Sequence, residues 1–230
     1  MKNKRGSGIL FLSLVLFAGY TALMVLVQQF DVQSIGPENS SVGFATLNRA
    51  VFLFFGGEFQ PTWYKISEIT GYIALATAAG FGLVGVIQWI KRRSLRRVDH
   101  ELLWLGAFYA VIIALYIIFL YVVVNYRPVI IDEEGLESSF PSSHTLLAVF
   151  VFSTGIYEAF RLFASKMGKT VLTVGSILAG ICCLLTVSGR LMSCAHWITD
   201  ILGGILLGAA FALLYIWVVK NLKRPLLTKN

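Results

Sequence analysis

The stretch LLWLGAFYAVIIALYIIFLYVVV, residues 102–124, contains no charged side chain. It is long enough for a transmembrane helix, which needs roughly 20 apolar residues. Five further stretches are nearly as apolar: Gly8–Phe30, Ile66–Ile90, Thr145–Phe163, Val171–Ser188 and Ile201–Val219. Together with Leu102–Val124 they predict an all-α, polytopic membrane protein with six transmembrane helices in a single bundle. We expect residues 1–230 to form one membrane-embedded domain.

The overall composition agrees with a membrane protein. Of 230 residues, 57% are hydrophobic and 13% are charged, and the mean hydropathy is +0.77. Soluble proteins carry roughly 25% charged residues. The cysteines are Cys182, Cys183 and Cys194, and no CxxC or HExxH motif accompanies them. We therefore expect no disulfide, no zinc site and no metal cofactor.

The distribution of basic residues predicts the orientation. The net charge is +7, but the Lys and Arg side chains lie in short clusters between apolar runs, without interleaved aromatics. This pattern excludes a nucleic-acid partner and is typical of membrane orientation signals. If six spans alternate, all but four of the 19 basic residues lie on one face, together with both termini. That face is predicted to be cytoplasmic, in the plasma membrane; the exceptions are Arg49, Lys65, Arg127 and Arg190.

Two apolar segments need separate interpretation. The first run follows Lys2, Lys4 and Arg5, as in a signal peptide, but it exceeds the short core of a signal, and no small-x-small cleavage site clearly ends it. We favour a retained anchor helix. The run Ala50–Phe55 is too short to span, so we expect it to lie along the interface or against the bundle.

Polar motifs gather at the ends of four predicted spans. Arg127-Pro128 closes the third span, and Pro141-Ser142-Ser143-His144 opens the fourth. Arg190 closes the fifth, and His196-x-x-x-Asp200 opens the sixth. With alternating spans, all of them lie at the outer edge. Ionisable groups at membrane depth are costly and therefore mark candidate functional sites.

These residue types suit phosphate chemistry. Arg127 and Arg190 can donate paired, charge-assisted hydrogen bonds to phosphoryl oxygens. A helix that begins at Pro141 offers free N–H groups, and the hydroxyls of Ser142 and Ser143 add to this anion site. The set therefore predicts binding of a phosphate group.

The remaining residues could carry out transfer. His196 and Asp200 are four apart and would share one helix face, so the carboxylate could hold one imidazole nitrogen and leave the other to attack phosphorus. His144 could protonate the departing alkoxide. Each motif alone has a simpler explanation: snorkelling arginines, a polar helix start or a structural hydrogen bond. Their coincidence at one edge favours an active site.

Two further groups have structural interpretations. Carboxylates beside a phosphate site would repel substrate, so we expect a solvated loop for the acidic residues Asp132, Glu133, Glu134 and Glu137. The glycines Gly203, Gly204 and Gly208 lie within the sixth span and indicate close helix packing.

The motifs resemble those of the type 2 phosphatidic acid phosphatase superfamily, which are KxxxxxxRP, PSGH and SRxxxxxHxxxD. The corresponding segments are LYVVVNYRP, PSSH and SGRLMSCAHWITD, within residues 120–200. The spacing from Arg190 to His196 to Asp200 is identical. The resemblance departs at Leu120, where the family has lysine, at Gly189, where it has serine, and at Ser143, where it has glycine.

The resemblance implies a role for each motif residue. His196 would be the nucleophile that forms a phosphohistidine, Asp200 its partner and His144 the general acid. Substrate phosphate would be held by Arg127, Arg190, Ser142 and Ser143.

The expected function is metal-independent hydrolysis of a lipid phosphate or pyrophosphate at the extracytoplasmic face. Undecaprenyl pyrophosphate, phosphatidic acid and phosphatidylglycerophosphate all fit. The alternative is a non-catalytic binder or transporter of polyprenyl phosphate or phospholipid, which the missing lysine favours. A vanadate-dependent peroxidase is disfavoured because those relatives are soluble. The sequence predicts no oligomeric state.

Overall fold

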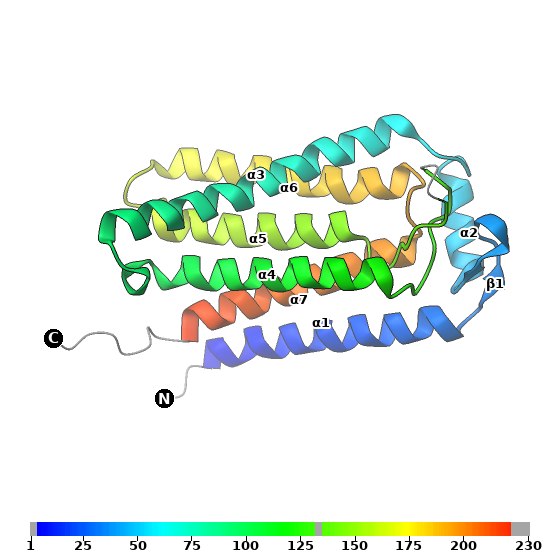
Figure 1. The fold of residues 1–230 in the computed structure, drawn as a ribbon, viewed down its shortest axis with the longest axis horizontal. Helices are drawn as coiled ribbons and strands as arrows, with labels where there is room; N and C mark the ends of the chain where they lie inside the picture. The colour runs from blue at the N-terminus through cyan, green and yellow to red at the C-terminus, as the bar shows by residue number, and fades with distance from the viewer. Residues whose placement is uncertain (1–3, 132–134, 222–230) are drawn as a thin grey trace.

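The computed structural model describes residues 4–131 and 135–221. Six of its helices are long and apolar enough to cross a membrane. They lie side by side in one bundle (Figure 1): α1 (Lys4–Gln29), α3 (Pro61–Arg92), α4 (His100–Tyr121), α5 (Ser143–Phe163), α6 (Lys169–Met192) and α7 (Ile198–Asn221). The shorter α2 (Ala45–Phe54) lies across one end, which we call the α2 end. The all-α, six-span prediction is confirmed.

One predicted helix end is wrong. α4 ends at Tyr121, so Arg127 lies in the connection to α5 and does not close the helix. The β-branched run Val122–Val124 lowers helix propensity. The chain pairs instead with a later segment: Arg127 N donates to Glu137 O at 3.1 Å, and Ser139 N donates to Asn125 O at 2.8 Å. This pairing places the first motif, which ends at Arg127-Pro128, beside the residues that lead into the second motif at Pro141.

Helix α7 packs between α1 and α5. From α1, Ser13 Oγ donates to the Ala210 carbonyl at 2.8 Å. Toward α5, a Cβ added at Gly204 would lie 2.7 Å from Ser142 O, and one at Gly208 would lie 2.8 Å from Leu146 O. These glycines therefore permit the close packing that the sequence predicts.

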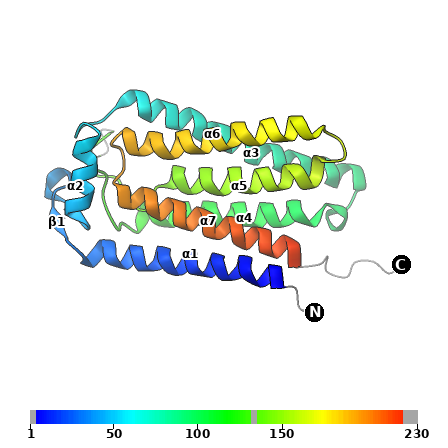
Figure 2. The same cartoon turned by 180° about the vertical axis from the view of Figure 1, so that it is seen from behind.

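Helices α3 and α6 pack closely along one side of the bundle (Figure 2). Thr186 Oγ1 donates to Thr70 Oγ1 at 2.8 Å across this contact. A Cβ at Gly189 would lie 2.9 Å from Ser67 Cβ and 3.0 Å from the Trp63 carbonyl oxygen. The glycine at this position is therefore explained by the approach of α3, which leaves no room for a serine.

The α2 end carries a small polar cap. The strands β1 (Gln33–Ser34) and β2 (Ser41–Val42) pair antiparallel, around the 3₁₀ helix η1 (Pro37–Asn39). Asn48 of α2 is buried and donates to Thr199 Oγ1 of α7 at 3.1 Å. Phe54 is 82% exposed. As expected, this short apolar helix lies against the bundle, and it leaves an apolar edge uncovered.

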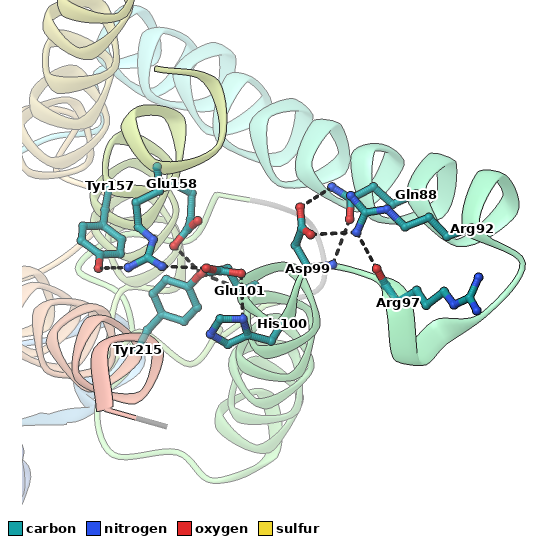
Figure 3. Close-up of polar contacts among 10 residues, drawn as sticks. Gln88, Arg92, Arg97, Asp99, His100, Glu101, Tyr157, Glu158 and Tyr215 are labelled. Atoms are coloured by element: carbon teal, nitrogen blue, oxygen red, sulfur yellow. Dashed lines mark hydrogen bonds and ion pairs between the residues drawn. The ribbon is translucent and has the colours of Figure 1, made fainter. Parts of the chain in front are cut away.

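The opposite end, where α1 begins and α7 ends, is tied by polar contacts (Figures 1 and 3). It includes the 3₁₀ helix η2 (Leu95–Arg97) between α3 and α4. Arg161 Nη2 lies 2.6 Å from Glu101 Oε1, and the Tyr215 hydroxyl donates to Glu158 Oε1 at 2.9 Å. These bonds join α4, α5 and α7, which apolar packing alone would hold weakly in lipid.

Candidate active site

The predicted site residues converge at the α2 end. The connection from α4 to α5, the start of α5 and the turn from α6 to α7 all lie there (Figures 1 and 2). Arg127, Ser143, His144 and His196 line one cavity of about 350 Å³. The other three predicted residues are fully buried (0% exposed): Ser142, Arg190 and Asp200.

His196 is linked to Asp200 through a third residue. His196 lies in the turn that precedes α7, whereas Asp200 lies within the helix. The prediction that the two residues share a helix face is therefore wrong. The distance from His196 Nδ1 to Asp200 Oδ2 is 3.8 Å, too long for a direct hydrogen bond. Ser139 Oγ lies between them, 2.9 Å from His196 Nδ1 and 2.5 Å from Asp200 Oδ2. The expected direct contact is therefore replaced by a serine bridge.

The bridge determines which imidazole nitrogen is free. A carboxylate accepts hydrogen bonds, so the Ser139 hydroxyl donates to Asp200 and accepts from His196 Nδ1–H. Nε2 then carries the lone pair, and it has no hydrogen-bond partner among the described residues. Burial lowers the pKa of His196 well below its ordinary value, and the charges of Arg127 and Arg190 lower it further. His196 is thus a neutral imidazole with an unengaged Nε2.

Two guanidinium groups supply unsatisfied donors. Arg190 has no hydrogen-bond partner for Nε, Nη1 or Nη2 within the described chain; its Cζ lies 4.4 Å from the centre of the Tyr64 ring. Arg127 pairs through Nη2 with Glu137 Oε2 at 3.0 Å, whereas its Nε and Nη1 lack partners. Arg190 is buried without an ion pair among the described residues, and a buried charge left unpaired costs several kcal/mol. An anion bound to Arg190 and to the free nitrogens of Arg127 would offset that cost.

The start of α5 completes this anion site. Ser142 is the N-cap of the helix, and its Oγ is buried without a hydrogen-bond partner, as is Thr145 Oγ1. Ser142 N donates to the Asp200 carbonyl at 3.0 Å, which fixes the helix start against α7. The N-terminus of a long helix attracts anions through its dipole.

His144 lies where a polar cavity meets an apolar one. It lines the 350 Å³ cavity and also a second cavity of about 300 Å³ between α3, α4 and α5. The second cavity is lined mainly by apolar side chains, among them Leu75, Ile112 and Ile113. A Cβ added at Gly71 of α3 would lie 3.2 Å from His144 Cδ2. The glycine therefore leaves room for the imidazole at this junction.

Two residues of the site were not predicted from the sequence. Ser139 precedes the second motif, and no pattern marked it as a partner of His196. Glu137 was expected in a solvated loop, but it pairs with Arg127 and lines the cavity. Asp132, Glu133 and Glu134 lie outside the described residues.

The departures from the family motifs have structural consequences. Leu120 lines the same cavity and is 51% exposed, so an apolar side chain stands where the family lysine is expected. Ser188 Oγ donates to Leu184 O at 2.7 Å within its own helix and does not replace the family serine.

Among residues 4–131 and 135–221, no group of three or more His, Cys, Asp or Glu side chains is placed to hold a metal ion.

The chain is similar to known proteins in part of its sequence and in its fold. Residues 121–224, which include the three motifs from Arg127 onward, match the family model of the PAP2 superfamily. The fold is similar to a crystal structure of a transmembrane PAP2-type phosphatidylglycerolphosphate phosphatase from Bacillus subtilis, with a TM-score of 0.62 and 18% sequence identity. The alignment covers 93% of this chain and 98% of that one. No curated protein matches the chain.

Proposed function

Because residues 121–224 match the family model of the PAP2 superfamily, we propose that this chain is a member of that superfamily and a lipid phosphatase that works through a phosphohistidine. One observation carries the proposal: the unengaged Nε2 of His196 lies in the same buried site as the unpaired guanidinium nitrogens of Arg127 and Arg190. A nucleophile beside unsatisfied cationic donors suits a phosphoryl group.

In the first step, His196 Nε2 attacks phosphorus and forms a P–N bond. The P–O bond to the lipid breaks, and the departing alkoxide takes a proton from His144. The Ser139 bridge keeps the proton of His196 on Nδ1, and Asp200 stabilises the positive charge that the imidazole gains.

In the second step, water attacks the phosphohistidine and passes a proton to His144. The P–N bond breaks, and inorganic phosphate leaves. Throughout, the free nitrogens of Arg127 and Arg190 bind the equatorial oxygens, on which negative charge is spread in the transition state. Ser142, Ser143 and the start of α5 add further donors.

The two cavities support a lipid as the substrate. A phosphate would occupy the polar cavity, and the tail of the lipid would extend past His144 into the apolar one, which faces α3 and α4. We place the α2 end outside the cell. The clustered basic residues between α3 and α4 and between α5 and α6 are at the other end, and the substrate would then come from the outer leaflet.

Phosphate release from a panel of lipid phosphates by the purified protein, with EDTA present, tests the activity. His196→Ala should reduce turnover by a factor on the order of a million, as loss of a nucleophile does elsewhere. His100→Ala is the matched control, because His100 lies at the opposite end, beside Glu101. Acid-labile phosphate should be trapped on the wild type and on His100→Ala. Wild-type turnover in a folded His196→Ala protein would refute the covalent route.

A non-catalytic binder of polyprenyl phosphate or phospholipid is the second candidate. The observation in its favour is Leu120, since an apolar side chain in the cavity removes one expected phosphate ligand. Saturable binding of lipid phosphate without phosphate release would support it. The complete His196–Ser139–Asp200 chain favours catalysis, because binding alone does not need an oriented imidazole.

A further inference from the structure

Glu137 holds one of the two arginines of the anion site. Its Oε2 lies 3.0 Å from Arg127 Nη2, with side-chain exposures of 31% for Glu137 and 14% for Arg127. The two backbones are also bonded, from Arg127 N to Glu137 O at 3.1 Å. The carboxylate is therefore a fixed part of the cavity wall.

The donors that remain free are enough for one phosphate. Arg127 keeps Nε and Nη1, and Arg190 keeps three nitrogens. A phosphomonoester has three non-bridging oxygens, and these donors with the Ser142 hydroxyl can bind them while the Arg127–Glu137 pair stays intact. Among the described residues, Arg127 is the only Lys or Arg that lines the cavity.

A second phosphate would meet a poor environment. It would have to displace Glu137 from Arg127, or lie against Leu120 and the neighbouring aromatic side chains Tyr116 and Phe119. The first choice breaks an ion pair and brings two anions together. The second leaves a charged group against apolar surface.

We propose that Glu137 and Leu120 make this site selective for lipids that carry a single phosphate over lipid diphosphates. This inference rests on the proposed function and names its substrate class. Glu137 lowers the positive charge of the cavity, and Leu120 withholds the cation that would hold a second phosphate.

Farnesyl phosphate and farnesyl diphosphate in detergent test the proposal, because they share one tail. The wild type should favour the monophosphate in kcat/KM by about tenfold or more, the size of one charge-assisted contact. Glu137→Gln keeps an oxygen that can accept from Arg127, and it should reduce this ratio by about tenfold. Leu120→Lys should act in the same direction, whereas Leu120→Met should leave the ratio unchanged.

Glu58→Gln is the control for a general change of charge, since Glu58 is an exposed residue at the α2 end outside the cavity; it should leave the ratio unchanged. A wild type that hydrolyses the diphosphate equally well would overturn the proposal. So would a Glu137→Gln protein that loses both activities equally, because Glu137 would then only position Arg127.

If the wild type hydrolyses neither lipid, binding decides the inference; the proposed function fails only if the panel of lipid phosphates also gives no phosphate release. Calorimetry with inorganic phosphate and inorganic pyrophosphate then gives the affinity of each anion. Glu137→Gln should strengthen pyrophosphate binding more than phosphate binding. Equal changes for the two anions would contradict selectivity at this site.

Discussion

Replacing Ser139 by alanine tests the bridge between His196 and Asp200. The hydroxyl accepts from His196 Nδ1 at 2.9 Å and donates to Asp200 Oδ2 at 2.5 Å. Without it, Nδ1 and Oδ2 remain 3.8 Å apart. Hydrogen bonds to charged groups contribute about 1.5–3 kcal/mol, so kcat/KM should fall roughly ten- to a hundredfold.

The assay combines lipid phosphate release with the rate at which acid-labile phosphate appears on the protein. Both should slow in Ser139→Ala, because a share of the imidazole would carry its proton on Nε2. Inhibition by inorganic phosphate should change little, since Ser139 does not supply the anion donors. Ser139→Thr retains a hydroxyl and should recover part of the rate, and Ser188→Ala, which removes a hydroxyl bonded within its own helix, is the control.

Wild-type kcat/KM in folded Ser139→Ala would refute the bridge. A rise in the phosphate inhibition constant equal to the loss in kcat/KM would also refute it, because Ser139 would then act on binding and not on the orientation of His196.

Three further predictions follow from the geometry. Gly71→Ala places a Cβ 3.2 Å from His144 Cδ2; turnover of alkyl phosphates should fall by about tenfold, with a smaller loss for p-nitrophenyl phosphate, whose leaving group needs no proton. NMR titration of histidine-labelled protein, assigned with His196→Ala, should show His196 neutral at pH 6.5 and protonated only as the pH falls further, since its pKa is lowered from 6.5; protonation above pH 6.5 would contradict the buried, cation-flanked site. Reporter fusions after Arg97 should score cytoplasmic and fusions after Gly135 external, and the reverse result would overturn the orientation.

The placement of the site at one edge of the membrane follows from the sequence. Apolar length predicts the spans, and alternation of the spans brings Arg127, His144, Arg190 and His196 to the same end. The computed fold agrees because a helix in lipid must satisfy its own backbone, which leaves little freedom in how long apolar runs fold. The spacing of the third motif likewise pointed to the family from local sequence alone.

The contacts inside the site depend on how distant segments pair. Treating residues 196–200 as helix suggested a direct His196–Asp200 bond, but the turn before α7 separates them and Ser139 enters from the α4–α5 connection. Glu137 was expected in solvent because a carboxylate beside a phosphate site would repel substrate. The backbone pairing with Arg127 nevertheless brings it into the cavity.

The sequence by itself determined a six-span membrane protein with its candidate phosphate-binding residues at one edge, because apolar length and motif spacing are local properties of the chain. Only the tertiary structure decided that Ser139 bridges His196 and Asp200, that Glu137 engages Arg127, and that Gly189 makes room for α3. These contacts join residues from separate segments, and side-chain hydrogen bonds and close packing form only where the fold brings such segments within a few ångströms.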